Sequence, residues 1–192
     1  MDKWADIRKS IDDSPKNIKV LTGSEDAAKK ALAKYFIPAD TGLGTVISNC
    51  GGIVVDDRLR IYGAGEIDIT VRNELYNIGA MIAAEDIYGG LFFFGSDNKL
   101  MYYAPDTLEP EETNLSYTPF LYWAITGDTD GFYSDLTYPG WQKEAAGLLY
   151  DQGIAFYPFL WTKEGKNLSR CTRNAVPMTE IVGFELDMNR KR

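Results

Sequence analysis

The spacing of apolar residues changes from a helical to a strand-like pattern near residue 50. Before that point apolar side chains recur every three or four residues, which predicts amphipathic helices over residues 4–11, 28–36 and 43–47. After it, short apolar runs alternate with turns rich in Gly and Asp, which is typical of antiparallel strands. These runs are residues 53–55, 59–62, 81–84, 91–94 and 99–103. Helices followed by a meander of strands indicate an α+β fold and not alternating βαβ units.

The last 90 residues carry weaker patterns. Residues 105–114 are polar and contain proline, so we expect a connection there. Helices are predicted over Tyr117–Thr126 and Gly140–Tyr150, whereas residues 154–161 and 178–188 fit either a strand or a helix.

The length of 192 residues corresponds to one domain. We predict a single α+β domain with a central, mostly antiparallel sheet flanked by N-terminal and C-terminal helices. Residues 1–50 form its helical N-terminal part, residues 51–104 the sheet, and residues 105–192 an acidic, aromatic-rich helical part.

The absence of histidine limits the chemistry available to the chain. Ser-His-Asp and Cys-His catalysis, histidine-ligated metals and histidine pH switches are excluded. Cys50 and Cys171 form no CxxC pair, so we expect two reduced, buried thiols, with a single disulfide as the alternative. We predict no catalytic residue, no metal site and no cofactor.

No apolar run has the length of a signal peptide or of a membrane-spanning helix, since the densest one is Leu91–Phe94. The net charge of −8 disfavours binding to nucleic acid. We therefore expect a cytoplasmic protein that binds neither membranes nor nucleic acid. The oligomeric state cannot be read from the sequence.

Negative charge is concentrated in residues 104–164. This segment contains ten acids and only two lysines, and it also contains 13 of the 25 aromatic residues. Acids interleaved with aromatic residues suit a basic, toxin-like protein partner, because charge steers the encounter and aromatic side chains anchor the contact. Most of these aromatic side chains are individually expected in the core, but the charge remains in either case. The candidate partner-binding residues are Asp106, Glu109, Asp128, Asp130, Asp135, Trp123 and Trp141.

A second hypothesis uses some of the same residues for carbohydrate chemistry. Glycosidases need two carboxyl groups and often stack sugars on aromatic rings. Asp128, Asp130 and Asp135, with Trp123 and Trp141, fit a carboxylate-dependent hydrolase or a carbohydrate-binding protein. A structural protein whose acidic surface has no role is the third hypothesis. Among these we favour a non-catalytic binding module.

Glu85 and Asp86 lie next to each other in an apolar stretch. Adjacent residues of a strand point to opposite faces of the sheet, so one carboxylate should point inward and need a partner. Arg58, Arg60 and Arg72 are candidates, and we predict a structural ion pair.

Two pairs of glycines are predicted to form structural turns. Gly51 and Gly52 follow the third expected helix and would permit a left-handed cap. Gly89 and Gly90 precede a strand. Valine at position 51 or 52 should destabilise the fold if these residues have positive φ.

Several blocks of the sequence resemble a bacterial family of uncharacterised cytoplasmic proteins that is known only as a domain of unknown function. The blocks include GGI, LRIYG, EDIYGG, YYAPDTLE and PFLWTKEG. The resemblance spans residues 35–180 and implies no activity. A short, glycine-based set of residues, Asn49, Gly51, Gly52 and the Gly89-Gly90 pair, is similar to the SUKH (Smi/Knr-like) superfamily, a more distant group. That resemblance implies an α+β fold and an immunity protein that neutralises a toxin.

Overall fold

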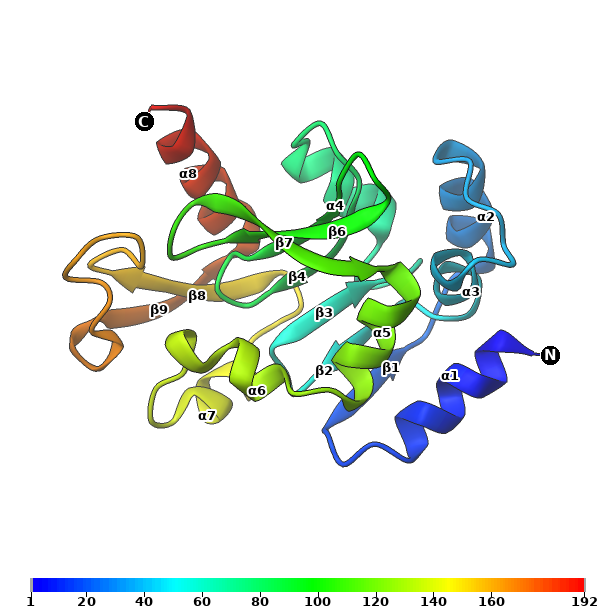
Figure 1. Cartoon of the computed structure of the whole chain (residues 1–192), viewed down its shortest axis with the longest axis horizontal. Helices are drawn as coiled ribbons and strands as arrows, with labels where there is room; N and C mark the ends of the chain where they lie inside the picture. Colours follow the sequence, from blue (N-terminus) through cyan, green and yellow to red (C-terminus); the bar gives the residue numbers. More distant parts are fainter. Residues whose placement is uncertain (1, 192) are drawn as a thin grey trace.

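Seven strands form one antiparallel sheet in which every strand pairs with its neighbours in sequence, in the order β1-β2-β3-β4-β5-β6-β7 (Figure 1). The structure is a computed structural model and describes residues 2–191. The strands are β1 Ile18–Leu21, β2 Gly52–Val55, β3 Leu59–Tyr62, β4 Ile82–Asp86, β5 Leu91–Phe94, β6 Lys99–Ala104 and β7 Glu109–Ser116. All residues of β2, β3 and β4 are buried, and they are mostly apolar apart from Arg60, Glu85 and Asp86.

Eight α-helices surround the strands of the described chain. They are α1 Lys3–Asp12, α2 Glu25–Lys34, α3 Gly42–Asn49, α4 Ile69–Tyr76, α5 Tyr117–Thr126, α6 Thr129–Phe132, α7 Trp141–Ala146 and α8 Met178–Arg190. Several begin where a side-chain oxygen accepts a hydrogen bond from the first turn: Asp2, Ser24, Thr41 and Asp68 cap α1 to α4 in this way. Short 3-10 turns occupy Ser134–Leu136 and Leu168–Arg170.

Helices cover both faces of the sheet. On one face Phe92 and Tyr102 are cross-strand partners, and Phe92 contacts Phe120 of α5 with ring centroids 4.8 Å apart. Helices α1 and α3 pack against α5. On the other face α4 packs against β4, and the Tyr103 hydroxyl donates a hydrogen bond to the backbone oxygen of Glu185 in α8. Polar side chains on both faces of the seven-stranded sheet are therefore shielded from water by the helices.

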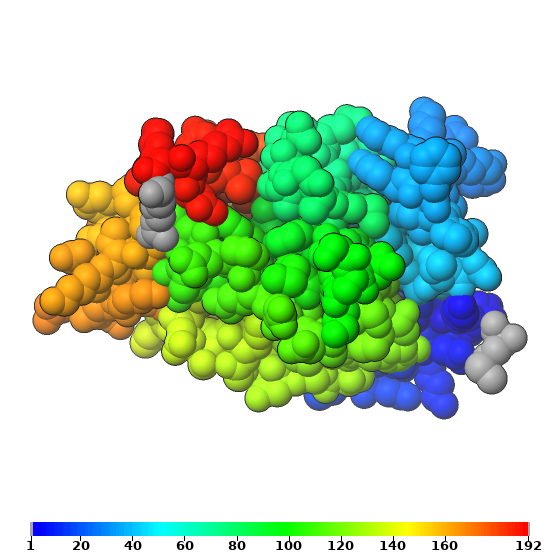
Figure 2. Space-filling view, turned by 45° about the horizontal axis from the view of Figure 1, so that its top comes forward, coloured from blue at the N-terminus to red at the C-terminus, as the bar shows by residue number. Residues whose placement is uncertain are grey.

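A separate hairpin lies beside the large sheet. Strands β8 Gln152–Tyr157 and β9 Thr172–Pro177 pair antiparallel, and α8 packs against both. In Figures 1 and 2 this hairpin and α8 lie together at one end of the molecule, opposite the N-terminal helices. The hairpin and α8 join the main sheet at the β4–β5 turn, where Ile154 donates a backbone hydrogen bond to Ile87.

The α+β class and the antiparallel sheet flanked by helices are confirmed. The connection expected at residues 105–114 is wrong from Glu109 onward, where β7 begins. Strands β1 and β9 were not predicted, and the helix expected over Gly140–Tyr150 is limited to α7. The two ambiguous segments become strand β8 and helix α8. Among the described helices none is long and apolar enough to cross a membrane.

The glycine pairs behave less uniformly than expected. Gly52 and Gly89 have positive φ, +141° and +105°, but Gly51 and Gly90 do not. The residue that ends α3 is Cys50, in extended conformation, so no left-handed cap forms there. Gly51 is required for another reason, because a Cβ atom at this position would overlap the carbonyl oxygen of Thr22.

Candidate functional site

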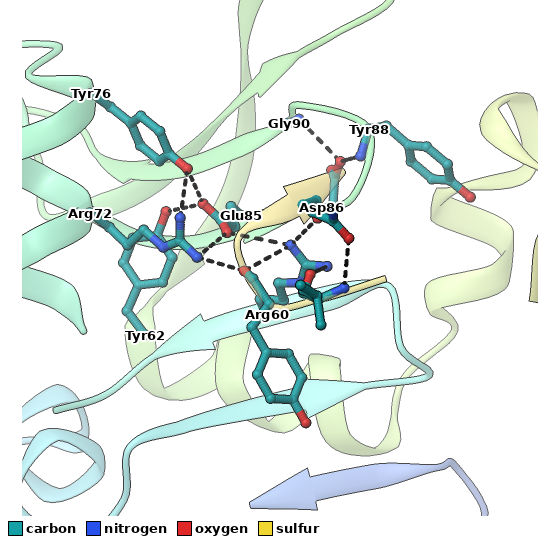
Figure 3. A network of polar contacts seen from close by, with 11 residues as sticks. Arg60, Tyr62, Arg72, Tyr76, Glu85, Asp86, Tyr88 and Gly90 are labelled. Atoms are coloured by element: carbon teal, nitrogen blue, oxygen red, sulfur yellow. Dashed lines mark hydrogen bonds and ion pairs between the residues drawn. The ribbon is translucent and has the colours of Figure 1, made fainter. Parts of the chain in front are cut away.

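Glu85 and Asp86 point to opposite faces of the sheet, and both side chains are buried. Glu85 lies 3.7 Å from Arg60 and 3.5 Å from Arg72, and the hydroxyls of Tyr62 and Tyr76 each donate a 2.8 Å hydrogen bond to its carboxylate (Figure 3). The predicted structural ion pair is confirmed, with Arg60 and Arg72 as partners.

The two arginines also tie this network to the rest of the chain. Arg60 donates to the backbone oxygens of Leu149, Tyr150 and Gln152, and Arg72 donates to that of Tyr150. These bonds fix the segment that enters β8. Because its side chains are buried, the network has a structural role and leaves no room for a substrate.

Asp86 points to the other face. It accepts hydrogen bonds from the backbone amides of Tyr88 and Gly90, at 2.8 and 3.1 Å, and from the hydroxyl of Tyr102 at 2.7 Å. Burial raises its pKa, and these hydrogen bonds oppose the increase. Asp86 thus shapes the β4–β5 turn. A Cβ atom at Gly90 would overlap both Asp86 and Tyr102, which explains the glycine there.

Three of the seven predicted partner-binding residues meet at one polar hollow of about 420 Å³. Asp128, Asp130 and Trp141 line it, together with Asp56 and Asp57 from the β2–β3 turn. We call these four aspartates and Trp141 the acidic hollow. It is not purely negative, since Lys16 also lines it.

The carboxylates of the acidic hollow already have structural partners. Asp130 forms a 2.7 Å ion pair with Arg58, whose guanidinium lies 4.4 Å from the ring centroids of both Tyr133 and Trp141. Asp128 accepts a 2.7 Å hydrogen bond from the amide of Gly131 at the start of α6. The hollow therefore presents negative charge on a well-fixed surface.

The other predicted residues lie elsewhere. Asp106 and Asp135 line a separate hollow, where Lys166 forms a 2.7 Å ion pair with Asp106. Glu109 is exposed on β7, the edge strand of the sheet. Trp123 is half-buried and contacts Phe120 and Phe132. The seven residues thus do not form one continuous site.

Neither cysteine is placed for chemistry. Both Cys50 and Cys171 are buried and unpaired, and burial raises the pKa of the Cys50 thiol to about 11. In residues 2–191 no group of three or more Cys, Asp or Glu side chains could hold a metal ion.

The structure also contains an apolar cavity that the sequence did not suggest. It has a volume of about 370 Å³ and lies between the β8–β9 hairpin, the loop after β8, α8 and the β4–β5 turn. We call it the aromatic pocket. Its lining residues are Tyr88, Ile154, Ala155, Phe156, Phe159, Leu160, Trp161, Val176, Glu180, Ile181, Phe184 and Glu185.

Three rings form one wall of the aromatic pocket. Phe159 and Trp161 stack with centroids 4.8 Å apart and ring planes 3° from parallel, and Phe184 of α8 lies 4.9 Å from Phe159. Phe184 remains 41% exposed, so this wall reaches the surface. A planar, apolar molecule could stack on it without any rearrangement of the sheet.

One buried carboxyl group lines the same pocket. Glu185 is 2% exposed, and its Oε2 atom has no hydrogen-bond partner among the described residues. The carboxyl lies against Gly89, where a Cβ atom would contact both of its oxygens. Burial, with a smaller contribution from the nearby charge of Asp86, raises the pKa of Glu185 well above its usual value. The buried site therefore favours the protonated carboxyl group, which can donate a hydrogen bond.

Comparison with known proteins assigns this chain to a family. The family model described as "Protein of unknown function DUF2625" matches residues 2–181, so the chain belongs to that family. It is 29% identical over 199 residues to "Putative uncharacterized protein YbfG" of Escherichia coli (strain K12), covering 96% of this chain and 91% of that protein. It is 26% identical over 175 residues to an "Uncharacterized protein" of Haemophilus influenzae, covering 82% of this chain and 77% of that protein. No solved structure matches the chain.

Proposed function

We propose that the protein is a non-catalytic binding protein that takes a small, mostly apolar molecule into the aromatic pocket. The observation that carries this proposal is an aromatic-walled cavity with one unpartnered carboxyl group. Small-molecule sites in proteins have volumes of roughly 300–1,000 Å³, apolar walls and a few polar groups that orient the ligand. The pocket, with its volume of about 370 Å³, meets each of these criteria.

The residues that line the aromatic pocket favour binding over catalysis. Among them there is no serine, cysteine or lysine to act as a nucleophile. The two carboxyl groups differ in position, since Glu185 is buried and Glu180 is exposed. The pocket therefore supplies stacking, apolar contact and one oriented polar group.

A neutral, environment-sensitive dye tests this function directly. We expect N-phenyl-1-naphthylamine to gain fluorescence on addition of the protein, because the pocket removes it from water. Trp161→Ala removes part of the stacked wall and should weaken dye binding severalfold. Phe36→Ala is the matched control, since Phe36 is 92% exposed and does not line the pocket. Equal binding by the two variants would contradict the proposal.

The acidic hollow favours a second function, the binding of a basic protein partner. Four aspartates and Trp141 line one polar surface, which suits charge steering with an aromatic contact. This is the immunity-type module that the resemblance to the SUKH superfamily implies. Because Asp128 and Asp130 are held by structural partners, we favour binding at this hollow over a hydrolase.

Co-precipitation with purified basic proteins at low and high salt tests the second function. The Asp128→Asn, Asp130→Asn double variant should lose a partner that the wild type retains at low salt and releases at high salt. A Glu109→Gln, Glu111→Gln double variant removes the same charge from the exposed strand β7 and should retain it. Loss in both variants would indicate only nonspecific attraction, and binding of a saccharide in place of a protein would favour the carbohydrate hypothesis.

A further inference from the structure

We infer that the ligand of the aromatic pocket is an organic amine with an apolar body, and that its ammonium group pairs with Glu185. This inference rests on the proposed function, because it names the chemical class of molecule that the same pocket accepts. It depends on the charges that line the pocket, on the unpartnered carboxyl group and on the aromatic wall.

The charges of the aromatic pocket have one sign. Glu180 and Glu185 line it, and no lysine or arginine does so among the described residues. An anionic ligand would meet two carboxyl groups and no cation. A cationic ligand meets a complementary surface, which is what a specific site requires.

Glu185 lacks the partner that a buried carboxylate needs. The titratable groups around it are Asp86 of β4, Tyr88 of the β4–β5 turn, Tyr103 of β6 and Glu180 of its own helix. None of these can supply a positive charge, so the carboxyl group holds its proton while the pocket has no ligand. A buried carboxylate with an ammonium partner is favourable only when the pair is also hydrogen-bonded, and the carboxyl group of Glu185, which lines the pocket, provides the acceptor.

Binding is then coupled to release of a proton. The neutral carboxyl group gives its proton to solvent, and the resulting carboxylate forms an ion pair with the ammonium group, whose N–H bonds remain intact. One proton leaves for each ligand bound. The affinity should therefore rise by about tenfold per pH unit in the range where free Glu185 is protonated and the amine is charged.

The aromatic wall suits the rest of such a ligand. The stacked Phe159 and Trp161, with Phe184 beside them, offer ring faces to an apolar body. Ring faces also attract a cation that lies over them. An arylalkyl amine can use both properties, because its ring stacks while its ammonium group reaches the carboxyl group.

Three probes of nearly equal size test the inference: phenethylammonium, 2-phenylethanol and phenylacetate. We expect calorimetry at pH 8 to show the amine binding at least tenfold more tightly than the alcohol, and phenylacetate not binding. Titrations in buffers of different ionisation enthalpy should show proton release on binding of the amine and none on binding of the alcohol.

Variants separate this inference from the proposed function. Glu185→Gln should reduce the affinity of the amine to that of the alcohol and leave the affinity of the alcohol unchanged. Asp187→Asn removes the same charge from the same helix but does not line the pocket, so it should change neither affinity. Phe184→Ala removes an exposed ring from the aromatic wall and should weaken the binding of both probes.

Each other outcome has a definite meaning. Equal binding of amine and alcohol by the wild type would overturn the amine inference and leave the binding function standing. An unchanged preference for the amine in Glu185→Gln would also overturn it. If no probe binds and the dye does not bind, both proposals fail.

Discussion

Replacing Glu185 by glutamine should make the protein more stable at neutral pH. The folded state favours the protonated form of this carboxyl group, because burial raises its pKa well above the ordinary 4.5. The stability due to the neutral group is fully present below the pKa of the unfolded chain, and it is lost as pH rises toward the raised pKa of the folded state. Glutamine has nearly the same shape and no proton to lose, so the variant avoids this cost.

The size of the effect follows from proton linkage. Over the pH range in which the folded state binds one proton at Glu185 and the unfolded state binds none, the free energy of unfolding falls by about 1.4 kcal/mol per pH unit. Asp86 also has a raised pKa, and its contribution to the difference cancels while Glu185 is neutral, because a neutral Glu185 and a glutamine leave Asp86 in the same electrostatic environment. Between about pH 5.5 and the raised pKa of folded Glu185, the difference in unfolding free energy between variant and wild type should therefore widen by about 1.4 kcal/mol for each pH unit.

Urea denaturation at pH 5.5, 6.5 and 7.5, followed by tryptophan fluorescence, measures this difference. Asp187→Asn on the same helix is the control and should run parallel to the wild type, because Asp187 is exposed. Parallel curves for Glu185→Gln and wild type would refute the reasoning. Such a result would mean that Glu185 is charged in the folded protein and has a partner that the pocket geometry does not show.

Three further substitutions test the fold by urea or thermal denaturation. Glu85→Gln leaves Arg60 and Arg72 without their carboxylate and should lower the free energy of unfolding by about 3–5 kcal/mol. A decrease below about 1 kcal/mol would mean that water reaches the network. Gly52→Val, at φ +141°, should cost about 1–3 kcal/mol, and an unchanged melting temperature would exclude strain there. Gly183→Ala, inside α8 with open space around it, should stabilise by about 0.5–1 kcal/mol, and destabilisation would contradict the open environment.

The sequence identified the strands that are buried on both faces and missed those at the edges. Strands β3 to β6 consist mostly of apolar residues because helices cover the sheet on both sides. Strand β7 is an edge strand with three glutamates and Pro110, and such residues prevent pairing with another chain. The features that protect an edge strand also remove the alternation by which a strand is recognised.

Of the candidate sites, too, one could be predicted from the sequence and another could not. The Glu85 network was predictable, because two adjacent acids in an apolar stretch need a buried partner. Glu185 was not, since one glutamate in an amphipathic helix has the pattern of a solvent-facing residue. Its burial depends on Gly89 and the β4–β5 turn, about 100 residues earlier in the chain. Without a motif, only the packing of these distant segments reveals such a site.

The pairing of strands in chain order has a consequence for the aromatic pocket. Strands β2 to β7 each pair with the strand before them, so contacts within the sheet join segments that are close in sequence, a pattern that favours fast folding. The aromatic pocket instead joins the β4–β5 turn to β8, β9 and α8, which come last in the chain. A ligand in the pocket would therefore link these C-terminal elements to the middle of the sheet. Amide exchange in α8 and β9 should then slow on binding, while that in β3 and β4 stays unchanged.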